Sequence, residues 1–138
     1  MIPVRILLVE DNPGDVELLN EVLSQSKVRL HLDIVDDGVE ALSLLRRCSS
    51  DDTLPNLILL DLNMPRVDGR DFLRAIKQEA AWCHIPIVVL TSSDAESDIA
   101  RSYSDGASCY VTKPVSLEGL RQIALTLENF WLTLVRLP

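Results

Sequence analysis

Five short aliphatic runs alternate with amphipathic stretches along the chain. Each run ends at polar residues, which is typical of a strand that is buried on both faces of a parallel sheet. The pattern therefore predicts five such strands. They are expected at residues 4–9, 30–35, 56–60, 85–90 and 109–112.

Local signals mark where the intervening helices begin and end. Asn12 followed by Pro13 provides an N-cap and a proline at the first helical position. Residues 37–40 resemble a capping box, and Ser116 is placed to cap the last helix. Gly106 is expected to end the fourth helix. The five helices should begin near residues 13, 37, 70, 95 and 117.

This alternation predicts an α/β fold with a five-stranded parallel sheet and helices on both faces. Right-handed crossovers leave few topologies, and the flavodoxin-like strand order 2-1-3-4-5 is the common solution for five strands. The length of 138 residues suits one domain. We expect its core over about residues 4–128 and an apolar tail over residues 129–138.

In a sheet of this kind, functional groups gather at the carboxyl ends of the strands. The first strand ends at Glu10 and Asp11, and the third ends at Asp61. The fourth and fifth end at Thr91 and Lys113. Three neighbouring carboxylates repel one another unless a cation neutralises them, and carboxylate oxygens suit Mg²⁺. We therefore expect Mg²⁺ at this edge of the sheet.

Asp61 is the expected nucleophile because it ends the central strand, between Asp11 on one side and Thr91 on the other. A carboxylate near Mg²⁺ can attack a phosphoryl group and form an aspartyl phosphate. The charge of the transferring group spreads over its oxygens. The Lys113 ammonium and the Thr91 hydroxyl are suitable donors to those oxygens.

Four segments at the strand ends resemble the receiver domain of two-component response regulators. The resemblance depends on the order and spacing of all four segments together. It implies a protein that accepts a phosphoryl group from a sensor histidine kinase and signals through a changed surface, without turning over a separate substrate. The segments are Val9-Glu10-Asp11-Asn12, residues 60–69, Leu90-Thr91-Ser92 and Tyr110-Val111-Thr112-Lys113-Pro114.

The resemblance also implies which residues bind the metal ion. Asp61 is the phosphoacceptor in this comparison. Mg²⁺ is bound directly by Asp11, Asp61 and the backbone carbonyl of Asn63. Glu10 acts through a water molecule.

Further roles follow from the same resemblance. Lys113 pairs with the phosphoryl group, Thr91 hydrogen-bonds to it, and Tyr110 turns inward when Thr91 moves. The Lys113–Pro114 bond resembles a cis bond of the family. The helix over residues 95–104 carries few large apolar side chains. We therefore expect this helix and the fifth strand to change on phosphorylation.

The tail after residue 128 is rich in large apolar residues. It either completes the last helix over the core or forms a protein interface, and the interface is favoured because aromatic-rich patches mark such surfaces. With this tail, the chain resembles the small regulators paired with bacterial and cyanobacterial phytochromes. These form homodimers through the fourth helix, fifth strand, fifth helix and tail. The resemblance indicates Tyr103, Phe130 and Trp131 as interface residues.

Composition argues against several other functions. The net charge of −8, without a basic cluster, disfavours nucleic-acid binding. No apolar run approaches the roughly 18 residues that a membrane span requires. The three cysteines stand apart from one another, and no signal-peptide pattern is present. Both features indicate a reducing compartment, and we expect a cytoplasmic protein.

Two alternative functions remain open. A Mg²⁺-dependent phosphohydrolase with an Asp nucleophile would need a second Asp two residues after Asp61, where the chain has Asn63. An interaction module without phosphorylation would have lost Asp61 or Lys113, and both are present. No residues remain to build an output domain, so the switch is expected to act alone.

Overall fold

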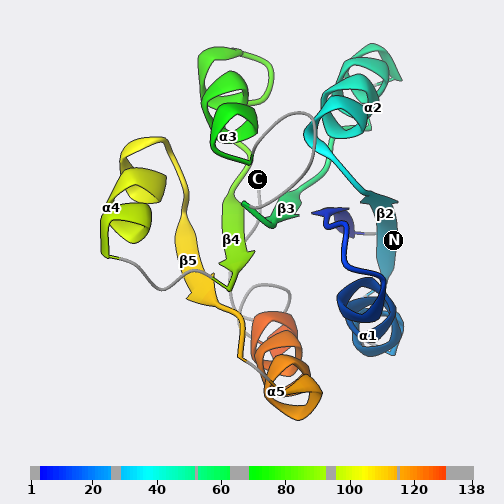
Figure 1. Cartoon of the computed structure of the whole chain (residues 1–138). Helices are drawn as coiled ribbons and strands as arrows, with labels where there is room; N and C mark the ends of the chain where they lie inside the picture. The colour runs from blue at the N-terminus through cyan, green and yellow to red at the C-terminus, as the bar shows by residue number, and fades with distance from the viewer. Residues whose placement is uncertain are drawn as a thin grey trace.

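The computed structural model describes residues 4–25, 29–51, 53–62, 69–92, 96–114 and 116–129. Strands and helices alternate along these residues (Figure 1). The strands are β1 (Val4–Val9), β2 (Leu30–Val35), β3 (Leu57–Leu60), β4 (Ile87–Thr91) and β5 (Cys109–Thr112). The helices are α1 (Pro13–Ser24), α2 (Gly38–Asp51), α3 (Gly69–Gln78), α4 (Glu96–Ser104) and α5 (Leu117–Leu127).

All strand pairs are parallel, and the strand order is β2-β1-β3-β4-β5. The predicted α/β fold and its topology are therefore confirmed. This order places β3 between β1 and β4, so Asp61 lies at the centre of the carboxyl edge. No helix within the described residues is long and apolar enough to cross a membrane.

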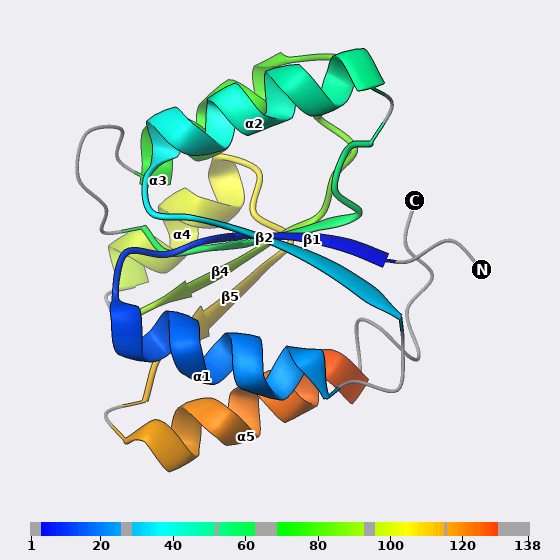
Figure 2. The same ribbon diagram turned by 90° about the vertical axis from the view of Figure 1, so that its right-hand side faces the viewer.

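Two helical layers enclose the sheet (Figure 2). α1 and α5 lie side by side on one face, whereas α2 and α3 cover the other, with α4 next to β5 (Figures 1 and 2). The side chains of alternate residues of β1 pack against the two helical layers. Leu7 and Val9 belong to the core under α2 and α3, and Ile6 and Leu8 belong to the core under α1 and α5. All four residues of β3 are buried, as expected for a central strand.

Capping interactions fix the helix starts that the sequence indicates. The Asn12 side chain accepts a hydrogen bond from the Asp15 amide, at 3.0 Å, and Pro13 opens α1. Asp37 accepts from the Glu40 amide at 2.9 Å, and Ser116 accepts from the Gly119 amide at 3.0 Å. After α4, Gly106 has φ +111°, a conformation that side-chain-bearing residues rarely adopt.

The structure differs from expectation around α2. From the sequence, this helix is predicted to run to about Cys48 and to be followed by a polar loop over residues 49–55. In the structure it continues to Asp51. The extra turn has a packing partner, because the buried Trp82 donates its indole N–H to the Ser49 hydroxyl at 2.7 Å. Trp82 thus joins the core under α2 and α3. Local polarity suggested a loop after Cys48 because this partner lies far along the chain.

The expected cis bond between Lys113 and Pro114 is not found. The described residues contain no cis peptide bond. The trans form is the preferred state of an X–Pro bond by roughly 0.5–1 kcal/mol, so a sequence motif alone does not fix the isomer.

α4 buries few of its described side chains. Among its described side chains, only Ser102 is buried. Asp98 pairs with Arg70 of α3 at 2.8 Å, and Tyr103 is 48% exposed. Such weak apolar packing agrees with the expectation that this helix has low local stability.

Gly69 provides a test of the close packing next to Asp61. A Cβ atom on Gly69 would lie 2.5 Å from the Leu62 Cα and 2.7 Å from the Asp61 carbonyl oxygen. These are backbone atoms and cannot turn aside. Gly69→Ala should therefore lower the free energy of unfolding by about 1–3 kcal/mol, measured by urea denaturation.

Gly14→Ala is the matched control. Its Cβ would meet only the Asn12 side-chain oxygen, at an ordinary 3.4 Å. This helical substitution should leave stability unchanged or raise it by less than about 1 kcal/mol. Equal stability of the two variants would show that the backbone at Leu62 yields.

Candidate phosphoacceptor site

Backbone hydrogen bonds at the ends of the strands hold the site residues in place. The Glu10 amide donates to the Val35 carbonyl at 3.0 Å, and the Asp61 amide donates to the Val9 carbonyl at 3.0 Å. The Lys113 amide donates to the Thr91 carbonyl at 2.7 Å. The sheet ladder thus continues to the first residue after three strands and brings their side chains to one edge.

The predicted carboxylates come together at this edge. Oxygen atoms of Glu10, Asp11 and Asp61 lie within 4.8 Å of one another. Glu10 and Asp61 are buried, whereas Asp11 is exposed. Thr91 is fully buried at the end of β4. Asn63, the fourth predicted metal ligand, lies outside the described residues.

The ammonium group of Lys113 lies among several carboxylates at this edge of the sheet. Its ammonium group pairs with Glu10, with Asp15 at 2.9 Å and with Asp61 at 3.5 Å. The remaining oxygen of Glu10 accepts from the Asp11 amide at 3.1 Å. In this state the buried Glu10 carboxyl is directed toward Lys113.

Asp15 is a site residue that the sequence does not predict. In sequence, an acidic residue in the first turn of a helix is explained by the helix dipole alone. The contact with Lys113 joins residues 98 positions apart. The only sequence signal was that α1 begins directly after the first strand and therefore starts at the same edge as the site.

Burial has opposite effects on the two ionisable partners. Desolvation and the neighbouring Asp61 carboxyl raise the pKa of Glu10 to about 8, although Lys113 acts in the opposite direction. Burial lowers the pKa of Lys113, but its hydrogen bonds to Glu10 and Asp15 outweigh this effect and raise the pKa above its usual value. The site therefore has more carboxylates than positive charge to neutralise them.

This imbalance fits a divalent cation. Glu10, Asp11 and Asp61 offer oxygen ligands, which hard cations prefer. Burial and, after it, the neighbouring Asp61 carboxyl raise the pKa of Glu10, and a cation would offset the second of these causes. Asp36, Asp37 and Glu40 form a second acidic group at the start of α2. Because Asp37 already accepts the Glu40 amide as a helix cap, that group has an ordinary structural explanation.

The two tyrosines of the predicted switch region are connected. The Tyr110 amide donates to the Tyr103 hydroxyl at 3.1 Å, which joins β5 to α4. Tyr110 is half-buried and packs against the core under α2 and α3. Phe130 and Trp131, the other predicted interface residues, lie outside the described residues.

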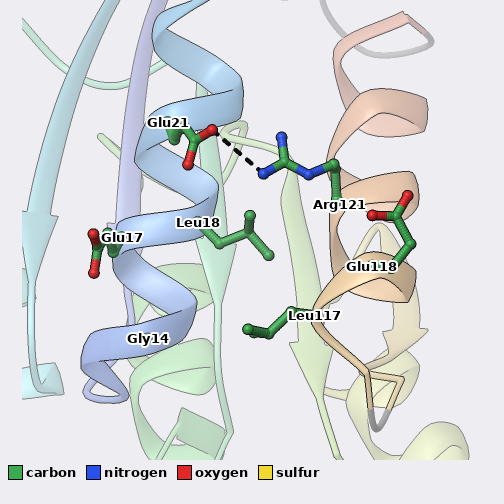
Figure 3. Close-up of a pocket in the computed structure, with 7 residues that line it drawn as sticks. All are labelled: Gly14, Glu17, Leu18, Glu21, Leu117, Glu118 and Arg121. Carbon is green, nitrogen blue, oxygen red and sulfur yellow. Dashed lines mark hydrogen bonds and ion pairs between the residues drawn. The ribbon is translucent and has the colours of Figure 1, made fainter.

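A groove runs between α1 and α5 from the end of the domain that carries the site (Figure 3). Leu18 and Leu117 point toward each other across it, and Leu117 is 64% exposed. Farther along, Glu21 and Arg121 form an ion pair at 3.3 Å. Glu17 points away from α5.

Comparisons with known proteins agree on one family. The sequence model of the response regulator receiver domain matches residues 6–125. The chain is 44% identical over 138 residues to response regulator Rcp1 of Synechocystis sp. (strain ATCC 27184 / PCC 6803 / Kazusa), covering 99% of this chain and 94% of that protein.

Two solved structures are similar over 99% of both chains. The Mn²⁺-bound form of response regulator Rcp1 has a TM-score of 0.93 at 43% identity. The phosphorylated cyanobacterial phytochrome response regulator RcpA has a TM-score of 0.94 at 42% identity.

The raised pKa of Glu10 predicts that divalent-cation binding depends on pH. Below pH 8 a proton on Glu10 competes with the cation, so affinity for Mg²⁺ should rise with pH and level off above about 8. If one proton is released, affinity should change by up to about tenfold per pH unit below that point. Isothermal titration calorimetry at pH 6, 7 and 8 measures this change.

Variants identify the site of that binding. Asp11→Asn should weaken Mg²⁺ binding at every pH, whereas Asp36→Asn removes a carboxylate of the second acidic group and should leave binding unchanged. An affinity independent of pH in the wild type would contradict the proton competition.

Proposed function

The chain belongs to the response regulator receiver family, and we propose that it is a phosphorylation switch that accepts a phosphoryl group on Asp61 with Mg²⁺. The donor is a phosphohistidine on a sensor histidine kinase, of the phytochrome-associated type. The observation that carries this proposal is the shared Lys113 ammonium beside a buried Asp61 and two further carboxylates.

In the proposed transfer, an oxygen of the Asp61 carboxylate attacks the phosphorus atom. A P–O bond to Asp61 forms as the P–N bond to the donor histidine breaks, and the imidazole leaves with the electron pair. Lys113 is within reach of Asp61, at 3.5 Å, and can pair with a phosphoryl oxygen. Thr91, buried at the end of the neighbouring strand, can donate its hydroxyl hydrogen to another oxygen.

Mg²⁺ would be held by Asp11, Asp61 and the Asn63 backbone carbonyl, with Glu10 acting through water, and would neutralise charge on the transferring group. The similar Rcp1 structure is a Mn²⁺-bound form, and Mn²⁺ shares the preference of Mg²⁺ for oxygen ligands. The similarity to a phosphorylated phytochrome regulator supports both the phosphorylation and the kinase class.

The signal would leave the site through β4 and β5. Movement of the Thr91 hydroxyl toward the phosphoryl group frees space for Tyr110, which is half-buried on the adjacent strand. Because the Tyr110 amide binds the Tyr103 hydroxyl, its movement would also shift α4. The protein would act in the cytoplasm as a switch and would catalyse only its own phosphotransfer and dephosphorylation.

Phosphorylation of the purified protein tests the proposal. Wild-type protein incubated with Mg²⁺ and a small acyl phosphate should gain one phosphoryl group by intact mass spectrometry. Asp61→Asn should gain none, because the amide is not a nucleophile toward phosphorus. Asp33→Asn is the control, because Asp33 lies on β2, which β1 separates from β3. This variant should be labelled like the wild type. Labelling of Asp61→Asn would identify a different acceptor.

We further propose a homodimer formed by α4, β5, α5 and the tail. The half-exposed Tyr103 side chain of α4 belongs to this surface and leaves an aromatic ring available for a contact. An isologous two-fold interface would place the same surface of each copy together.

Replacing the aromatic residues of the tail tests this interface. Sedimentation should show a monomer for the double variant Phe130→Ala, Trp131→Ala, because aromatic anchors contribute a large share of interface energy. Ile34→Ala removes an exposed apolar residue from the opposite edge of the sheet and should leave the dimer intact. An unchanged dimer in the double variant would place the interface elsewhere.

A further inference from the structure

Asp15 is a fourth carboxylate at the phosphoacceptor site. Its Oδ2 atom lies 2.9 Å from the Lys113 Nζ atom. The oxygen atoms that could share a cation belong to Glu10, Asp11 and Asp61, and Asp15 is not among them. Within the described part of the chain, the contact of Asp15 with these groups is through Lys113.

The ordinary explanation of Asp15 is a capping residue of α1. An acidic residue at this position can reach back to the amide of the N-cap residue. Here the Asn12 amide points instead to Glu10, at 3.5 Å. Asn12 caps α1 through its own side chain, which accepts the Asp15 amide. The carboxylate of Asp15 is thus directed toward Lys113 while the cap is provided by Asn12.

Lys113 is held more closely by Asp15 than by the phosphoacceptor. Its distance to Asp61, 3.5 Å, exceeds the normal range of an N–H···O hydrogen bond, whereas 2.9 Å to Asp15 lies within it. The pair is largely screened from solvent, since the side chains of Lys113 and Asp15 are 12% and 17% exposed. The negative charge of the Asp15 carboxylate therefore acts more strongly on groups in the site than the charge of a fully exposed residue would.

We propose that Asp15 is a positioning residue that holds Lys113 in a resting position and slows the entry of an anionic phosphoryl donor. The inference rests on the proposed function of Asp61. A cation held by Asp61, with Glu10 engaged through water, would compete with Lys113 for both carboxylates, whereas Asp15 lies outside that group and keeps its contact. A donor phosphate then has to compete with Asp15 for the ammonium group and to approach one additional negative charge.

The step itself balances without Asp15. An Asp61 oxygen forms a bond to phosphorus, the P–O bond of an acyl phosphate breaks, and the carboxylate leaving group takes the electron pair. Asp15 changes only the charge and the position of Lys113 around that step. Its effect should therefore appear in the donor concentration needed for half-maximal rate and not in the maximal rate.

The test is the rate of phosphorylation by a small acyl phosphate in the presence of Mg²⁺, measured over a range of donor concentrations. Asp15→Asn keeps the size of the side chain and removes its charge. Its rate at low donor concentration should rise roughly three- to tenfold, with the maximal rate unchanged within about twofold. The gain should shrink at high salt, because added ions screen the charge.

Two variants serve as controls. Glu17→Gln removes one negative charge from the same helix, at an exposed side chain that points away from α5 (Figure 3). It should phosphorylate like the wild type. Asp15→Glu keeps the charge and should retain the slow rate, which an effect of side-chain shape alone would not produce.

The outcomes separate this inference from the proposed function. A wild-type rate or a slower rate in Asp15→Asn, with the wild type labelled on Asp61, would overturn the role of Asp15 alone. An equal gain in Glu17→Gln would also overturn it, because overall charge would then explain the effect. A wild-type protein that gains no phosphoryl group would overturn the proposed function and this inference together.

Discussion

The ammonium group of Lys113 is surrounded by more carboxylates than it can neutralise, and the rest of the site is organised around that imbalance. A parallel sheet forces it, because the ends of β1, β3 and β5 meet at one edge and carry Glu10, Asp61 and Lys113. The buried carboxyl of Glu10 responds with a raised pKa. Such a site can accommodate a divalent cation and a phosphoryl group. The cation supplies positive charge to the carboxylates, and the phosphoryl group pairs with the ammonium group of Lys113.

The sequence was sufficient for the features that depend on local rules. Buried aliphatic runs located the strands, and Asn12, Asp37 and Ser116 located three helix starts by their capping chemistry. Because strand ends in a parallel sheet converge, the sequence also predicts that Asp61, Thr91 and Lys113 lie together. The roles of these residues in phosphorylation stay predictions.

The features that the sequence did not predict depend on contacts between distant segments. The pairing of Asp15 with Lys113 requires the first turn of α1 to face the end of β5, and no periodic pattern encodes that orientation. The last turn of α2 likewise depends on Trp82, which lies 33 positions after Ser49 in the sequence. In both cases a polar side chain near a helix end had an adequate local explanation, which concealed its tertiary partner.

Trp82 gives the domain a built-in optical probe. One of the two tryptophans of the chain is buried in the core under α2 and α3, with its indole N–H engaged by Ser49. Trp82 precedes β4 and so lies toward the amino ends of the strands, opposite the carboxyl edge that carries Asp61. In a protein whose other tryptophan, Trp131, is replaced by phenylalanine, the emission of Trp82 would follow the integrity of that core separately from the chemistry at the opposite edge.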